Sequence, residues 1–274
     1  MSGIAGRASR PRRRGASALP LALTGLAVAA VALLVLPLVG LFLRTPWSRL
    51  AALLAEDRVH QALRLSLVSS LAALALCTVL GVPLAWVLAR RQFPGKRLLR
   101  ALCLLPMVLP PVVGGVALLV AFGRRGFVGQ PVEQLTGITL PFTTAGVVLA
   151  EAFVALPFLV VTVEAGLRAM DRRYEDAAAT LGASRATTFR RVTLPLIGPS
   201  LTAGMALCWA RALGEFGATI TFAGNRAGRT QTMPLAVYLE LERDLGVALL
   251  LSLVLLFASV AVLVTVRAGS FTSP

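Results

Sequence analysis

Histidine, cysteine and phosphate-binding motifs are scarce or missing in this sequence of 274 residues. The one histidine, His60, cannot supply a histidine metal cluster, and no Ser, His and acid set is placed for nucleophilic catalysis. No GxxxxGK[ST] loop occurs, so the chain should not hydrolyse ATP. We therefore expect neither an enzyme nor a metal or cofactor bound by this chain. The three cysteines, which fall within apolar segments and form no evident disulfide framework, are Cys77, Cys103 and Cys208.

Charged residues are also few. They make up 14% of the chain against 57% hydrophobic residues, and the mean hydropathy is +0.82, which is far too apolar for an ordinary soluble domain. The longest interval between apolar segments, residues 168–195, leaves no room for a soluble domain. No fixed-period repeat and no inverted pair of broken segments is present. The sequence predicts one compact membrane domain.

Apolar segments long enough to cross a bilayer are the main feature of the chain. A hydrocarbon core of about 30 Å needs roughly 20 apolar residues as a helix. The length of the segments and their lack of strict alternation favour helices over barrel strands, so we predict an all-α integral membrane protein. Residues 1–18 form a basic arm, residues 19–267 the membrane domain and residues 268–274 a short tail. The six predicted transmembrane helices are Leu19–Leu43, Ala62–Ala89, Leu98–Phe122, Thr143–Leu167, Leu196–Phe222 and Val247–Val266.

The distribution of basic residues predicts the orientation. With both termini in the cytoplasm, 17 of the 27 Lys and Arg residues lie inside, 9 lie outside, and Arg211 falls within a span. This bias fits the positive-inside rule. The first apolar segment is too long for a signal peptide, so we expect an uncleaved helix. The arginines of the arm are then expected to contact anionic lipid rather than nucleic acid.

A polar, arginine-rich stretch separates the fourth and fifth predicted helices, within residues 168–195, which we call the coupling loop. Residues 176–181 contain three alanines in a row and follow an acid, so they favour a short helix whose dipole the acids complement. Gly182 provides a stop. Pro195 lies near the start of the next apolar segment, where proline is tolerated. We expect a small docking element held against a membrane helix.

The third predicted helix opens with a run of prolines and glycines. Pro106, Pro110 and Pro111 precede Gly114 and Gly115, so a regular helix should kink or start late there. Small residues also let neighbouring helices approach closely. The bend could therefore line a translocation path or serve packing alone.

Two opposite charges lie within the fifth predicted helix. A charge inside a membrane is costly unless it is paired or faces water. Arg211 and Glu215 are spaced i, i+4, which puts them on one helix face where they can pair. A neutralised pair is the favoured interpretation, and the alternative hypothesis is that Arg211 gives a pore a positive field for a dianion. The candidate residues of the anion path are Arg211, Glu215, Thr219, Thr221 and Asn225.

The coupling loop resembles the cytoplasmic signature of ABC importer permeases: EAA, three residues, Gly, nine residues, Ile-x-Leu-Pro. Asp176-Ala177-Ala178, Gly182 and residues 192–195 match it at the family's spacing, with Asp176 replacing Glu and Val192 replacing Ile. The resemblance implies an ABC importer permease fold whose loop inserts into a cleft of a separate ATPase subunit. The residues expected to couple the two subunits are Glu175, Asp176, Ala177, Ala178, Gly182, Val192, Leu194 and Pro195.

The region after Arg211 indicates which group of ABC importer permeases the chain resembles. GEFGATITFAGN at residues 214–225 and GRTQTMPLAVYLELE at residues 228–242 resemble molybdate-type permeases, as does LLPMVLPP in the third predicted helix. The resemblance runs from about Leu63 to Val266. It implies a permease subunit for a tetrahedral oxyanion, molybdate or tungstate, in a bacterial cell membrane. The implied partners are two ATPase subunits, which use the ATP, an extracytoplasmic molybdate-binding protein and a second copy of the permease.

Three alternatives stay open from the residues alone. Sulfate and thiosulfate permeases share GEFGA but usually diverge after it. A proton- or sodium-coupled carrier would need a relay of intramembrane acids, for which only Glu151, Glu164 and Glu215 are available. A membrane-anchored assembly factor would carry no anion at all.

Overall fold

The computed structural model of the chain describes residues 21–271, with side chains from 23 to 261 and at 264. Within these residues the secondary structure is entirely helical. The chain divides into two compact units at Thr45 and Pro46, and each is described by itself. The predicted arm, residues 1–18, and the end of the predicted tail lie outside the described residues. The division into arm, membrane domain and tail stays a prediction.

The first unit contains one long helix, α1 (Leu21–Arg44). It matches the first predicted membrane helix to within two residues at its start and one at its end. Its large apolar side chains are exposed, and Leu33 and Leu34 are 74% and 71% accessible. A helix that is apolar on every side suits a lipid environment.

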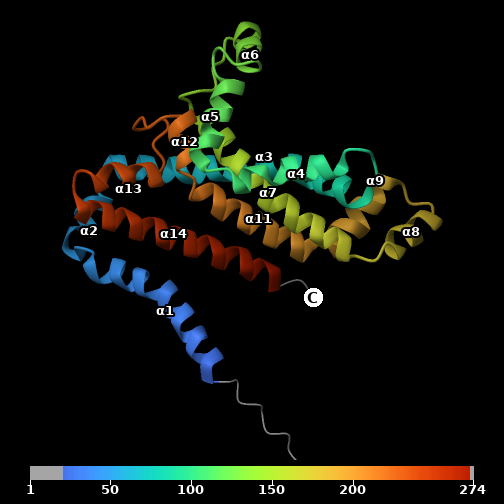
Figure 1. Ribbon diagram of the computed structural model, residues 1–274, viewed down its shortest axis with the longest axis horizontal. Helices are drawn as coiled ribbons and strands as arrows, with labels where there is room; N and C mark the ends of the chain where they lie inside the picture. The colour runs from blue at the N-terminus through green and yellow to red at the C-terminus, as the bar shows by residue number, and fades with distance from the viewer. Residues whose placement is uncertain (1–20, 272–274) are drawn as a thin grey trace, which may run out of the picture. The chain divides into compact units, whose positions relative to one another are not determined.

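The second unit is built on long helices that lie side by side (Figure 1). α3 (Asp57–Arg90) packs against α7 (Thr144–Ala169), α7 packs against α11 (Gly198–Leu213), and α11 packs against α14 (Leu245–Phe271). α4 (Lys96–Val108) also packs against α7. These helices contain the second and sixth predicted membrane segments, the fourth except its first residue, and parts of the third and fifth.

Small residues fill the core between α3, α7 and α11. Ala73, Cys77, Ala85, Ala155 and Cys208 are fully buried there. Because bilayer lipid is as apolar as a leucine side chain, helices in a membrane associate through close packing, which small residues permit. Cys77 and Cys208 are free thiols, in line with the packing role predicted for them.

Two of the predicted membrane helices are broken. α4 and α5 (Pro111–Phe122) meet at an angle of 119°, and Pro110 and Pro111 occupy the cap and first turn of α5. The kink predicted from the prolines is therefore confirmed. The fifth predicted helix bends by 75° between Leu196 and Gly198 and ends at Leu213, short of the predicted Phe222. A break at Gly214 follows, where the chain turns into the short helix α12 (Gly217–Phe222).

Helix lengths set bounds on the number of membrane spans. α1, α3 and α7 are each long and apolar enough to cross a bilayer, and up to five spans result if each bent pair counts as one. The Leu245–Ala261 part of α14 forms a shorter apolar helix. The six-span count and the orientation with both termini inside stay predictions.

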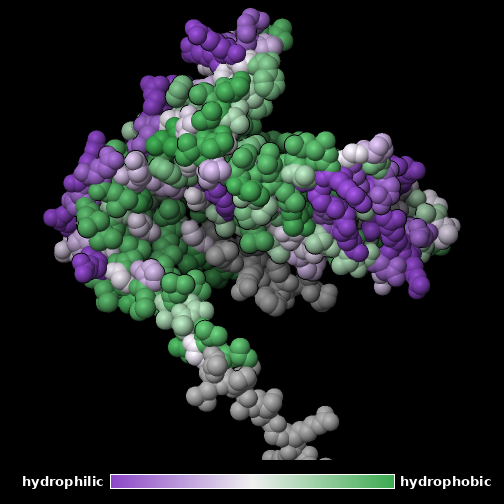
Figure 2. Space-filling model, viewed as in Figure 1, coloured by the Kyte–Doolittle hydropathy of each residue, from purple (hydrophilic) through white to green (hydrophobic). Residues whose placement is uncertain are grey.

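The two ends of the second unit differ in the short helices that they carry. In Figure 1, α8 and α9 lie at one end, and α2 and α13 lie at the other. Figure 2 shows hydrophilic residues gathered over the α8 and α9 end, with apolar residues along the helices between the ends. The short helices are η1 (Trp47–Arg49), α2 (Leu50–Leu54), α6 (Gly129–Thr136), α8 (Arg173–Thr180), α9 (Arg185–Thr188), the π-helical η2 (Phe189–Thr193), α10 (Leu194–Leu196), α12 and α13 (Met233–Leu241).

Basic residues concentrate at the α8 and α9 end. α3 ends in Arg90, Lys96 starts α4, and Arg168 lies in the last turn of α7. The loops that leave these helices, together with α8 to η2, hold the arginines of the coupling loop. This clustering supports, by the positive-inside rule, the predicted cytoplasmic side for this end.

Candidate coupling loop and intramembrane charges

The predicted short helix of the coupling loop is α8, and the turn that follows caps its C-terminal end. Gly182 has φ +80°, a left-handed conformation that glycine adopts without steric cost. The N–H of Ala183 donates to the carbonyl of Ala178, and the N–H of Gly182 donates to that of Ala179, both at 3.0 Å. This pair of bonds is the Schellman motif, in which the last carbonyls of a helix are satisfied by the turn itself. Gly182 therefore ends α8 as predicted.

Glu175 ties α8 to the membrane helices. Its Oε2 lies 3.1 Å from Nε of Arg90, at the end of α3, and its Oε1 accepts a hydrogen bond of 2.9 Å from Oγ1 of Thr193, in η2. The Arg90 side chain is only 8% exposed. Removal of either partner of a buried ion pair is costly, because it leaves an uncompensated charge. One carboxylate thus joins α3, α8 and η2.

The other face of α8 and its turn is open. Asp176, Ala177 and Gly182 are exposed, whereas Ala178 is half-buried. Leu181, beside Gly182, is 88% exposed. Small residues around an exposed leucine form a low surface that another protein can approach closely.

The chain returns from α8 to the membrane through tightly wound segments. Ser184 caps α9 by accepting a hydrogen bond from the N–H of Thr187. The π-helical η2 follows and runs into α10, which contains Pro195 in its first turn. Val192 and Leu194 are half-buried and Pro195 is exposed. The matched positions of the signature therefore lie on one continuous path from α8 to α11.

Arg211 and Glu215 form the predicted ion pair. Nη2 of Arg211 lies 2.6 Å from Oε2 of Glu215, and the glutamate side chain is 1% exposed. The predicted geometry is wrong in one respect: α11 ends at Leu213, so Glu215 lies in the break and not on the same helix face. The break lets Oε1 of Glu215 also accept a hydrogen bond of 2.7 Å from the N–H of Ala218, in the first turn of α12. Glu215 therefore serves both the arginine and a helix start.

The other two intramembrane acids also have partners. Glu164, in α7, pairs with Arg168 at 2.8 Å and with Arg100 of α4. Glu151, 1% exposed, accepts a hydrogen bond of 2.8 Å from Oγ of Ser69. These contacts tie α7 to α4 and to α3, although Oε2 of Glu151 is buried without a hydrogen-bond partner.

The remaining candidates for the anion path are dispersed. Thr219 is fully buried and its hydroxyl has no hydrogen-bond partner, whereas the hydroxyl of Thr221 donates to the carbonyl of Gly217 at 2.8 Å. Asn225 lines a pocket of about 290 Å³ between α3, α13 and α14, which Arg211, Glu215 and the two threonines do not line. Within one chain, the five candidates do not share that pocket.

The glycines at the predicted kink lie in a packing interface. A Cβ on Gly115 would come within 2.6 Å of Cβ of Thr221 in α12, and one on Gly114 within 3.1 Å of the Phe153 ring in α7. Pro110 and Pro111 are exposed. The glycine half of this segment therefore lets α5 approach α7 and α12.

The sequence did not predict the contacts between residues that lie far apart along the chain. Arg90 and Thr193 hold Glu175, and Ser70 accepts a hydrogen bond from Nε1 of Trp209. Arg90 stands immediately before a polar loop, which is the only local hint of its role. In the described residues, no group of three His, Cys, Asp or Glu side chains could hold a metal ion.

Comparison with known protein families identifies the family of this chain. Residues 81–269 match the family described as the binding-protein-dependent transport system inner membrane component. The chain belongs to this family. It is therefore a membrane component of the ABC importer permease fold, as the coupling-loop signature predicted.

Relatives of this chain include permeases named for molybdenum transport and for sulfate transport. It is 48% identical over 246 residues to the molybdenum transport system permease protein ModB of Mycobacterium tuberculosis, which covers 90% of this chain and 92% of the relative. It is 38% identical over 239 residues to the sulfate transport system permease protein CysT of Salmonella typhimurium, with 86% of each chain covered.

A solved structure shares the fold. The bacterial alginate ABC transporter, in complex with its alginate pentasaccharide-bound periplasmic protein, has a chain that superposes with a TM-score of 0.74. The match covers 92% of this chain and 93% of that chain at 15% identity. At this identity the likeness concerns the fold alone.

Proposed function

We propose that this chain is the transmembrane permease subunit of an ATP-driven importer for a tetrahedral oxyanion, with molybdate as the first candidate and tungstate as its close analogue. It works in a bacterial cytoplasmic membrane as a homodimer, with two ATPase subunits on one side and an anion-binding protein on the other. The chain binds no cofactor of its own, and its partners bind and hydrolyse the ATP. It has no role with nucleic acid.

The geometry of the coupling loop carries this proposal. α8 presents exposed small residues on one side, and on the other Glu175 is fixed to Arg90 and Thr193. A force applied to the exposed side by a partner is therefore transmitted to the ends of α3 and η2. A loop that only connected two membrane helices would need neither the open face nor the buried ion pair.

The proposed cycle uses two states that ATP stabilises differently. Closure of the two ATPase subunits draws the two α8 helices of the dimer together and opens the cavity outward to accept the anion. Hydrolysis then resets the dimer to the inward state. Identical permease copies give the two ATPases identical loops, as two-fold symmetry requires.

The choice of molybdate rests on similarity. The relative named for molybdenum transport is 48% identical over nine-tenths of this chain, whereas the relative named for sulfate transport is 38% identical. A sulfate permease is the second candidate for this reason. A carrier driven by an ion gradient is less favoured, because Glu164 and Glu215 are held in ion pairs with arginines.

The test is the ATPase activity of the reconstituted complex of permease, ATPase and cognate binding protein. We expect molybdate and tungstate to stimulate hydrolysis and to accumulate in vesicles, with sulfate at least tenfold less effective. Stimulation by sulfate alone would establish the second candidate. Uptake that persists without ATP but collapses with the ion gradient would refute an ATP-driven importer.

A further inference from the structure

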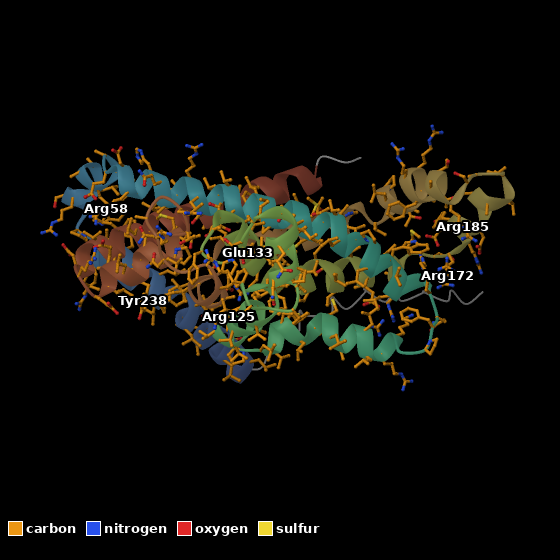
Figure 3. All side chains as sticks on the ribbon, turned by 90° about the horizontal axis from the view of Figure 1, so that it is seen from above. Arg58, Arg125, Glu133, Arg172, Arg185 and Tyr238 are labelled. Carbon is orange, nitrogen blue, oxygen red and sulfur yellow. The ribbon has the colours of Figure 1, made fainter. Side chains whose placement is uncertain are left out.

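A pocket of about 330 Å³ lies on the inner side of the coupling loop. The end of α3 forms one wall with Trp86, Arg90 and Arg91, and the opposite wall comes from α8, α9 and η2. Arg172 and Arg185 line it from the loop, and Figure 3 shows both at the same end of the unit, away from Arg58 and Tyr238. The open face of α8, described above for the ATPase, shares Asp176 with the pocket, whereas Ala177, Leu181 and Gly182 do not line it.

The charges that line the pocket do not cancel. Four arginines line it against two acids, Glu175 and Asp176. Glu175 already serves Arg90 and Thr193, and Asp176 is exposed. The lining therefore carries surplus positive charge, and the pocket is open to the outside of the chain.

Arg90 contributes buried donors that no acceptor within the chain satisfies. Its side chain is more than nine-tenths buried, its Nη2 has no hydrogen-bond partner, and its Nε meets Glu175 as an ion-pair contact without hydrogen-bond alignment. Buried guanidinium donors without acceptors are costly, so such groups ordinarily have a partner. An oxyanion with several oxygen acceptors can satisfy them in pairs, since the planar guanidinium fork matches phosphate geometry.

The position of the pocket fits the headgroup layer of a membrane. Trp86 lies near the end of α3, and the guanidinium of Arg91 stands 5.7 Å from the centre of its ring. Earlier on the same helix, Val79 and Leu80 are 69% and 55% exposed, as lipid-facing residues are. Tryptophan marks the membrane interface, and basic pockets beside membrane helices on the cytoplasmic side bind anionic headgroups.

We propose that this pocket, between the end of α3 and the coupling loop, binds a phosphate group through Arg90, Arg172 and Arg185. The phosphate is carried by an anionic phospholipid or is free in solution. The bound group would complete the hydrogen bonds of Arg90 and join α3 to the loop alongside Glu175. The binding is independent of the transported anion and of the proposed function, because it is measured on the permease chain alone.

The experiment titrates the purified, delipidated permease with three probes: inorganic phosphate, short-chain phosphatidylglycerol and short-chain phosphatidylcholine. Native mass spectrometry counts bound lipid, and tryptophan fluorescence follows both lipid and phosphate, with Trp86→Phe to identify the reporting residue. Binding of phosphatidylglycerol but not phosphatidylcholine assigns the phosphate to an anionic lipid. Binding of inorganic phosphate alone assigns it to the free ion. Binding of neither phosphatidylglycerol nor phosphate overturns the proposal.

Variants locate the binding. Arg172→Gln with Arg185→Gln should weaken it at least tenfold, and both side chains are exposed, so their loss should leave the fold intact. Arg173→Gln with Arg190→Gln removes two neighbouring arginines that do not line the pocket and should leave binding unchanged. Arg90→Lys keeps the charge but loses the guanidinium fork, and weaker binding is expected there too. If the double variant at Arg172 and Arg185 bound the probe as tightly as the control double variant at Arg173 and Arg190, the phosphate group would bind elsewhere.

Discussion

The carboxylate of Glu175 stands 3.1 Å from the guanidinium of Arg90. This contact joins α8 to the end of α3, which is far from it in the sequence. The pair is largely withdrawn from water, so it is screened less than a surface pair and is more sensitive to the loss of one partner. Its position between an exposed face and a long helix makes it a first target for mutation.

Glu175→Gln should lower the free energy of unfolding by about 2 kcal/mol, since it removes a charged hydrogen-bond acceptor and leaves Arg90 unpaired. Uptake by the reconstituted complex should fall further than ATPase association does. Thermal unfolding in detergent and vesicle uptake measure the two effects. Glu242→Gln, which neutralises an exposed glutamate, is the control and should change neither. If Glu175→Gln left both stability and uptake unaltered, the pair would have no mechanical role.

Gly182→Val should abolish uptake and weaken ATPase association, because a branched residue at φ +80° costs about 1 to 2 kcal/mol or more and distorts the end of α8. No atom lies within 4 Å of the position a Cβ would take, so the effect comes from the backbone alone. Gly137→Val, at φ +71° outside the coupling loop, is the matched control. It should cost similar stability and spare ATPase binding, as measured by co-purification of the subunits. Equal loss of association in both variants would remove the specific role of Gly182.

Arg211→Gln should cost about 3 to 5 kcal/mol, because it leaves the buried Glu215 carboxylate without its cation. The double variant Arg211→Gln with Glu215→Gln should recover most of this stability and, if the pair is structural, the uptake too. Urea unfolding and anion uptake are compared across the single and double variants. Recovery of stability without recovery of uptake would instead support the hypothesis that Arg211 supplies a positive field to the anion. Normal abundance, assembly and uptake in Arg211→Gln alone would eliminate that hypothesis.

Gly115→Ala should destabilise the second unit by about 1 to 3 kcal/mol, because the added methyl would meet Cβ of Thr221 at 2.6 Å and the carbonyl oxygen of Ala218 at 2.9 Å. Gly114→Ala is the adjacent control, since its nearest neighbour is the edge of the Phe153 ring at 3.1 Å, which can shift. Thermal unfolding of the two variants should separate them clearly. Equal stability would show that α5 and α12 can move apart without cost.

Asp244 should make the start of α14 sensitive to acid. The N–H groups of Val247 and Gly246 and, to a smaller extent, the Arg49 guanidinium hold the pKa of Asp244 below its ordinary value. A lowered folded-state pKa gives stability that is present above the unfolded pKa, about 3.9, and lost as the pH falls through the folded value. The melting temperature of the native protein should therefore exceed that of Asp244→Asn at pH 7, and the difference should shrink as the pH falls from the unfolded pKa through the lower folded-state pKa. A difference that stayed constant across this range would contradict the assignment.

Local sequence features predicted much of this molecule. Apolar length located the long helices, and the residues near Gly182 predicted both α8 and its end, because helix propensity and a left-handed glycine act over a few residues. The prolines at 110 and 111 predicted a bend, but not that it would reach 119°. An angle of that size depends on what α5 packs against, and its neighbours α7 and α12 come later in the chain.

The candidate site was predicted less completely than the fold. The spacing predicted that Arg211 and Glu215 would pair. It did not predict the break after Leu213, which occurs at Gly214 and where Glu215 accepts a hydrogen bond from the N–H of Ala218 in α12. Nothing beside Glu175 in the sequence points to Arg90, because their contact requires α3 and the coupling loop to have packed first. Residues that act through such long-range contacts can be found only once the helices are placed.

The closure of α8 by Gly182 and Ala183 has a consequence for the transport cycle. Since the turn itself satisfies the carbonyls of Ala178 and Ala179, neither a water molecule nor a partner residue is required at these two groups. In the proposed cycle the loop would therefore pass from an aqueous setting into a cleft of the ATPase, and out again, with these main-chain bonds unchanged. Repeated association and release during many turnovers would then leave its shape intact.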